Sequence, residues 1–108
     1  MGLSRDTLIG AARDYGTPLF VYDADLMLQR YRELSDFITW PKLQVMYAMK
    51  ANYSVGLLRV LQQAGAALDT VSPGEVVLAT QIGFPVDRLL YTANNITDDE
   101  VRQVQRSG

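Results

Sequence analysis

The sequence predicts an α/β fold made of the first βα units of a TIM (β/α)8 barrel. Three apolar runs begin near residues 43, 67 and 88, and a helical pattern follows each of them. Strands and helices that alternate at this spacing imply right-handed βαβ units and a parallel sheet. Three units leave one sheet edge open, and the chain reaches Gly108 directly after a helix. We therefore expect an incomplete barrel that belongs to a longer protein.

Residues 1–41 precede these units, and their pattern predicts a helix, a strand and a second helix. Ser4 is placed to cap the first helix and Gly16 to stop it. The apolar run 19–22 predicts a short strand, and Asp23 is a good cap for the next helix. That helix should end at 40–41 and bury a stripe of residues at helical spacing, namely Met27, Tyr31, Leu34 and Ile38.

Residues 42–108 supply the barrel portion, in which local signals mark each boundary. Strands are expected over 43–48, 67–71 and 88–92. Ser54 should cap the helix after the first strand, and that helix should close at Gly65. Capping-box patterns, 72–75 with a proline at the first helical position and 97–100, open the next two helices.

Composition excludes several classes of function. A net charge of −2 with no basic patch argues against a nucleic-acid partner, and no apolar stretch approaches the roughly 20 residues that cross a bilayer. The sequence contains no cysteine and no histidine, so disulfides, thiolate metal sites and histidine acid–base chemistry are excluded, and we expect no metal. With no signal-peptide pattern at its start, the protein is expected to be cytoplasmic.

Lys50 is the first candidate for chemistry. Alternation along the strand puts Met46, Ala48 and Lys50 on one face, with the lysine at the carboxyl end, where barrels gather catalytic groups. An amine removed from water is more easily neutral, and the neutral amine attacks an aldehyde to form a Schiff base. Ala48 is small and would leave space for a planar ring. The competing interpretation is that Lys50 only marks the strand's end and points into solvent.

Asp69 is the second candidate, because it interrupts the apolar run 66–71. An ionised carboxylate in that place needs a cationic or hydrogen-bonding partner. Lys50 is the obvious partner if the first two strands are neighbours. An exposed edge position, or an arginine from a helix, explains Asp69 equally well.

Several segments, taken together and in this order, resemble a known family. They are Gly16–Asp23, the hexapeptide Tyr47–Asn52 (Tyr-Ala-Met-Lys-Ala-Asn), Asp69–Glu75, Gly83–Pro85 and Tyr91–Asn95. The chain resembles the N-terminal part of the alanine-racemase-like, fold-type III pyridoxal-phosphate-dependent decarboxylases, and within them the diaminopimelate decarboxylase branch. The resemblance covers essentially the whole chain, and the hexapeptide is its most specific piece.

The resemblance implies a role for each candidate. Lys50 matches the lysine that holds pyridoxal 5′-phosphate as a Schiff base, Ala48 the small residue beneath the cofactor, and Asp69 the nearby acidic residue. It also implies an amino-acid substrate, with meso-diaminopimelate converted to L-lysine and CO2, and a homodimer for the full-length protein. The family's C-terminal β-domain, ring-stacking histidine, phosphate site and partner-subunit cysteine have no counterpart here. We therefore expect little or no decarboxylase activity from these 108 residues alone.

Three residues depart from the family's pattern and put the substrate in doubt. Pro73 and Ala93 stand where glycines are usual, and Ile96 stands where a lysine is frequent. These departures weaken the substrate assignment, so a decarboxylase of another basic amino acid competes with the first interpretation. A non-catalytic pyridoxal-phosphate-binding barrel and a small α/β binding domain also remain compatible with the sequence.

Overall fold

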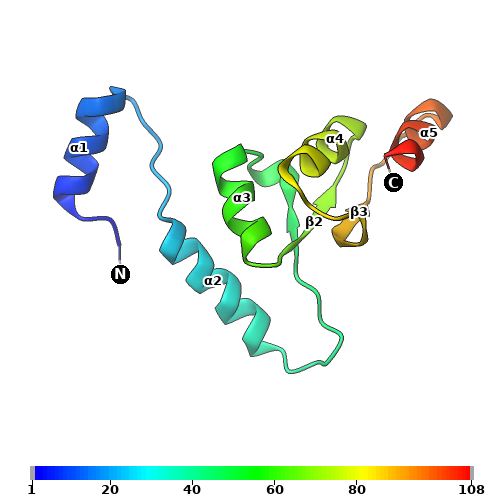
Figure 1. The fold of residues 1–108 in the computed structure, drawn as a ribbon, viewed down its shortest axis with the longest axis horizontal. Helices are drawn as coiled ribbons and strands as arrows, with labels where there is room; N and C mark the ends of the chain where they lie inside the picture. The colour runs from blue at the N-terminus through cyan, green and yellow to red at the C-terminus, as the bar shows by residue number, and fades with distance from the viewer. Residues whose placement is uncertain (1, 108) are drawn as a thin grey trace.

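A three-stranded parallel sheet forms the centre of the molecule, in a computed structural model that describes residues 2–107. Strands β1 (Met46–Ala48), β2 (Ala67–Thr70) and β3 (Leu89–Tyr91) lie side by side in sequence order (Figure 1). The register aligns Tyr47 with Leu68 and Leu68 with Leu89. The predicted α/β class, with strands that alternate with helices in a parallel sheet, is confirmed. Each strand is shorter than the sequence pattern suggested: the ladder takes up the end of the run 43–48, all but the last residue of 67–71 and the middle of 88–92.

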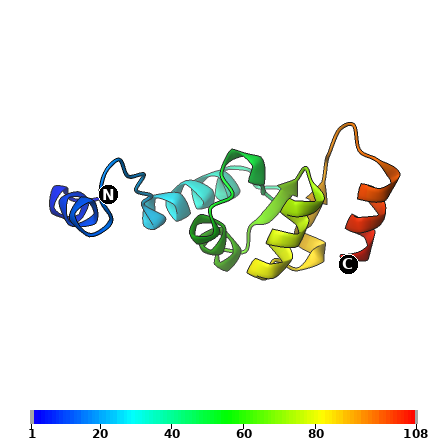
Figure 2. The same cartoon turned by 90° about the horizontal axis from the view of Figure 1, so that it is seen from above.

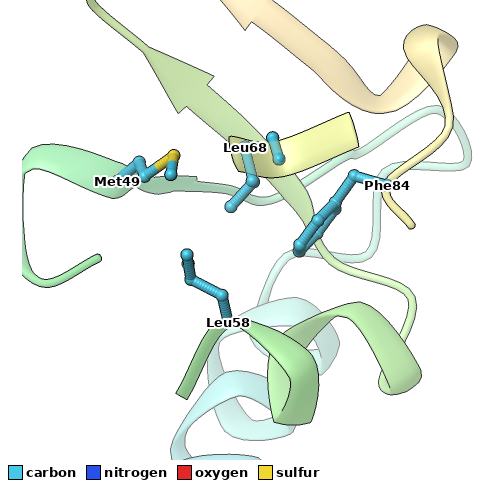
Figure 3. Close-up of a cluster of buried hydrophobic side chains, with 5 residues drawn as sticks. Met49, Leu58, Leu68 and Phe84 are labelled. Atoms are coloured by element: carbon cyan, nitrogen blue, oxygen red, sulfur yellow. The ribbon is translucent and has the colours of Figure 1, made fainter. Parts of the chain in front are cut away.

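Helices α3 (Val55–Gln63) and α4 (Pro73–Ile82) follow β1 and β2, and they bury one face of the sheet. Figure 3 shows the cluster they form with the sheet, in which Met49, Leu58, Leu68 and Phe84 point toward one another. Met49, Leu58 and Leu68 are completely buried. Burial of each such side chain contributes about 1.5–3 kcal/mol to the hydrophobic term of folding. This cluster fixes the position of both helices on the sheet.

The strands' alternation divides the sheet into a covered and an open face. Leu68 points into the helix-covered core, so its neighbour Asp69 lies on the opposite face. The register places Ala48 on one side of Asp69 and Leu90 on the other. Ala48, Asp69 and Leu90 therefore form one row across the open face, on which Leu90 is 45% exposed.

Helices α1 (Arg5–Tyr15) and α2 (Ala24–Phe37) precede the sheet and lie outside the three-stranded core (Figures 1 and 2). Both begin as predicted, because Ser4 accepts a hydrogen bond from the Thr7 amide and Asp23 accepts one from the Leu26 amide. Gly16, with φ +82°, ends α1. A positive φ suits glycine, which explains its position there.

Two expectations for residues 1–41 are wrong. The run 19–22 forms no strand, although its backbone lies between the helices, and Phe20 is 87% exposed. An apolar run becomes a strand only where a neighbour completes its hydrogen bonds, and the described residues offer none. In addition, α2 ends at Phe37 rather than at 40–41, and its apolar stripe is incompletely buried, with Leu34 52% exposed.

Short 3-10 helices complete the fold: η1 (Met49–Ala51) follows β1, and η2 (Val86–Arg88) precedes β3. The last helix, α5 (Asp98–Arg106), packs against α4. No helix in the described part of the chain is long and apolar enough to cross a membrane.

The capping predictions gave mixed outcomes. Thr97 and Glu100 form the complete reciprocal box, with the Glu100 carboxylate accepting from the Thr97 amide at 2.7 Å. At α4, Ser72 accepts from the Glu75 amide as predicted, but the Glu75 carboxylate accepts from the Val71 amide at 2.8 Å instead of from that of Ser72. The Ser54 side chain makes no capping bond.

Candidate functional site

Lys50 lies on η1, which directly follows the carboxyl end of β1. The strand expected to run to residue 48 ends there, and residues 49–51 form η1, so Lys50 lies on a turn and not on the strand. Met49 is completely buried in the core, and the Lys50 side chain is exposed. Lys50 therefore projects from a short turn that packs against β2.

Ala48 and Asp69 are register partners on the neighbouring strands β1 and β2. Both are partly exposed on the open face of the sheet. Because the side chain of Ala48 is only a methyl group, it leaves space on the sheet surface beside the Asp69 carboxylate. The turn that carries Lys50 directly follows Ala48. An amine, a small side chain and a carboxylate therefore lie at the carboxyl ends of the first two strands.

Asp69 does not form an ion pair with Lys50. The ion pairs of the described residues are Arg30–Glu33 on α2 and Asp99–Arg102 on α5, both exposed. Instead, the Thr92 hydroxyl donates a hydrogen bond to the Asp69 carboxylate. Thr92 directly follows β3, and its amide donates to the Thr70 carbonyl at 2.9 Å, which extends the ladder by one bond. Sequence reasoning missed Thr92, although a polar residue at a third strand's end was a usable signal.

Asn52 joins the turn of Lys50 to two tyrosines and to α3. Its backbone carbonyl accepts from the Tyr47 hydroxyl at 3.1 Å, and its side-chain amide donates to the Tyr22 hydroxyl at 2.8 Å. Its side-chain oxygen accepts from the Ser54 amide at 2.9 Å. Burial, and next to it the neighbouring Tyr22, raises the pKa of Tyr47, which keeps this phenol protonated as a donor at neutral pH.

An apolar hollow of about 880 Å³ lies beside β1. It is bounded by the segment before α2, by α2 itself and by the outer edge of β1. Its lining includes Val21, Met27, Tyr31, Met46 and Ala48. The half-buried stripe of α2 thus faces this hollow instead of a closed core.

A family model described as "Pyridoxal-dependent decarboxylase, pyridoxal binding domain" matches residues 25–108. The chain is 42% identical over 99 residues to a diaminopimelate decarboxylase of Methanothermobacter thermautotrophicus, an alignment that covers 90% of this chain and 23% of the relative. It is 41% identical over 93 residues to a diaminopimelate decarboxylase of Bacillus subtilis, covering 84% of this chain and 21% of the relative.

Solved structures give the same result for the fold. A lysine/ornithine decarboxylase of Vibrio vulnificus, complexed with cadaverine, superposes with a TM-score of 0.88 at 28% identity over 95% of this chain and 27% of that chain. The chain thus spans about a quarter of the length of the relatives it matches.

Proposed function

This chain belongs to the pyridoxal-dependent decarboxylase family, and from that premise we propose that it binds pyridoxal 5′-phosphate covalently through Lys50. The observation that carries the proposal is the position of Lys50. Its side chain is exposed on η1 at the carboxyl end of β1, beside the open row of Ala48 and Asp69. Lys50 is in neither of the ion pairs of the described residues, so no carboxylate occupies its amine.

The residues present fit such a group. A primary amine supplies the covalent attachment, and Ala48 presents only a methyl group where a flat ring would lie. The Asp69 carboxylate, held by Thr92, supplies negative charge beside a ring system that becomes cationic on protonation. The amine comes from η1, the small residue from β1 and the carboxylate from β2, and the buried cluster around Met49 and Leu68 holds these elements together.

Lys50, Asp69 and Ala48 would each have a separate role in binding pyridoxal phosphate. Lys50 would hold the cofactor through its amine, which can condense with an aldehyde with loss of water. Asp69 would orient the bound group on the open face of the sheet, and Ala48 would leave space for it. When bound, pyridoxal phosphate acts as an electron sink for the bond that is cleaved in decarboxylation.

For the whole protein, we propose decarboxylation of meso-diaminopimelate to L-lysine and CO2, by a homodimer. The relatives that are 42% and 41% identical, both named diaminopimelate decarboxylase, support this substrate. Decarboxylation of lysine or ornithine is the second candidate, since the Vibrio vulnificus enzyme of that name shares the fold at 28% identity. Product analysis with each amino acid distinguishes the two substrates.

The attachment site can be tested without turnover, because the sequence contains only two lysines, Lys42 and Lys50. The protein is mixed with pyridoxal phosphate, reduced with borohydride and mapped by mass spectrometry. We expect the label on Lys50, its loss in Lys50→Arg and its retention in the matched control Lys42→Arg. Label that stays at full level in Lys50→Arg would overturn the assignment.

We propose that the 108 residues bind the cofactor without turning over substrate. The chain has no histidine or cysteine that could take part in acid–base chemistry. Incubation with pyridoxal phosphate and meso-diaminopimelate should therefore release no measurable lysine. Lysine release that disappears in Lys50→Arg would contradict this part of the proposal.

A further inference from the structure

Asn52 stands at the centre of a hydrogen-bond group that holds the turn of Lys50 on three sides. Its carbonyl is fixed by Tyr47 from β1, its side-chain amide by Tyr22 from the segment before α2, and its side-chain oxygen by the Ser54 amide at the start of α3. The bond to Tyr22 spans 30 residues of sequence. Each partner comes from a different element, so the group ties the turn to the strand before it, to the helix after it and to the N-terminal segment.

The turn between β1 and α3 has few other restraints. Lys50 and Ala51 are exposed, and the Ser54 side chain makes no cap bond to α3. Met49, which precedes Lys50, anchors the start of η1 in the core through its buried side chain. Asn52 lies after Lys50 in the chain. Buried packing therefore fixes the turn before Lys50, and hydrogen bonds fix it after Lys50.

We infer that Tyr22, Tyr47 and Asn52 are positioning residues, which hold the turn so that Lys50 stays at the carboxyl end of the sheet. This inference rests on the proposed role of Lys50. It also gives a function to the segment 17–23, which forms no strand and yet contributes the Tyr22 hydroxyl to the turn. An amine on an unrestrained turn would sample many positions, and only those beside Ala48 and Asp69 would favour cofactor binding.

The burial of Tyr47 is consistent with this arrangement. The raised pKa of its phenol, caused first by burial, keeps the hydrogen on the oxygen, so the bond to the Asn52 carbonyl persists at neutral and mildly alkaline pH. Tyr22 is 52% exposed and accepts from Asn52, so removal of its hydroxyl disturbs little else. This exposure makes Tyr22→Phe the cleanest single test of the group.

The test compares Tyr22→Phe, Tyr47→Phe and Asn52→Ala with the control Tyr53→Phe. Tyr53 adjoins Asn52, is 64% exposed and makes no side-chain hydrogen bond among the described residues. Pyridoxal phosphate is titrated into each protein, and the borohydride-trapped label on Lys50 is quantified. We expect the concentration for half-maximal labelling to rise about fivefold to tenfold in Tyr22→Phe and in Tyr47→Phe, each of which loses one hydrogen bond. The rise should be at least as large in Asn52→Ala, which loses two, and the concentration should stay unchanged in Tyr53→Phe.

A second measurement needs no cofactor and separates positioning from general stability. Amide hydrogen exchange is followed over 49–54 at a temperature where circular dichroism shows every variant folded. Exchange at Ser54 should accelerate in Asn52→Ala and be restored in Asn52→Asp, which keeps an acceptor for that amide. The double variant Tyr22→Phe/Asn52→Ala should label like Asn52→Ala alone, because both changes remove the same bond.

The outcomes distinguish the two proposals. Label that is absent from Lys50 in the unmodified protein overturns the proposed function, and the exchange measurement still decides the positioning role. The positioning role is overturned if Tyr22→Phe and Asn52→Ala show the same amide exchange rates and the same half-maximal labelling concentration as Tyr53→Phe. This outcome does not depend on which residue carries the cofactor.

Discussion

Thr92 donates its hydroxyl hydrogen bond to the carboxylate of Asp69, and this contact joins the ends of β2 and β3 on the open face of the sheet. The two residues are 23 positions apart in the sequence. The contact gives the carboxylate a neutral partner within the sheet instead of an ion pair with Lys50. Asp69 is in neither of the ion pairs of the described residues, so no cation within the sheet occupies its carboxylate on the open face.

Replacement of Thr92 by valine should release Asp69. Valine keeps the β-branched shape but cannot donate, so we expect a loss of about 1 kcal/mol in the free energy of unfolding, measured by urea titration. Thr92→Ser retains the hydroxyl and should stay close to the unmodified protein. Equal stability of the valine and serine variants would show that the bond contributes nothing.

Enlargement of Ala48 should block the open face without unfolding the sheet. In Ala48→Leu the added carbons lie beside Asp69, where the cofactor ring is proposed to lie. Labelling of Lys50 by pyridoxal phosphate and borohydride should fall about tenfold or more, while the circular dichroism spectrum stays the same. Ala24→Leu, an equal enlargement at the exposed start of α2, is the matched control and should label normally. Full labelling of Ala48→Leu would remove Ala48 from the site.

The sheet could be predicted because its signals are local. Apolar runs, capping side chains and glycines act within one turn or strand, and they placed the three strands and most helix starts correctly. The strand expected at 19–22 failed because pairing depends on a neighbour that the run itself does not specify. The division of the chain at residues 41 and 42 stays a prediction.

The details of the site depended on tertiary contacts. Alternation was expected to extend through Lys50, but β1 ends at Ala48 and Lys50 lies on η1. Thr92 and Tyr22 reach the site from distant parts of the chain, and only the register and the path of the N-terminal segment bring them there. Asn52 belongs to the hexapeptide on which the resemblance depends. Nothing in the sequence showed, however, that its side-chain amide and its backbone carbonyl bind different tyrosines.

Removal of the Tyr91 hydroxyl should stabilise the protein. Its oxygen is buried and has no hydrogen-bond partner among the described residues. Burial, then the nearby Glu100 and Glu75, raises the pKa of Tyr91. An unpaired buried polar group is unfavourable, so Tyr91→Phe should raise the melting temperature by a few degrees in a thermal scan. The control is Tyr15→Phe at an 81% exposed position, and a lower melting temperature for Tyr91→Phe would contradict the prediction.

Helix α5 should loosen in acid through Glu100. Hydrogen bonds from the Thr97 amide, and then from the Thr97 hydroxyl, hold the pKa of Glu100 below its usual 4.5. Because the pKa is lower in the folded state, the carboxylate's stabilisation is present above pH 4.5 and is lost as the pH falls through the folded value. Glu100→Gln should therefore melt below the unmodified protein at pH 7, and the two should converge as the pH falls below 4.5 and through the folded-state pKa. Circular dichroism melts across this range test it, with Asp87→Asn on η2 as the control. A difference that stays constant from neutral to acidic pH would assign the effect of Glu100→Gln to packing and not to the charge at the helix start.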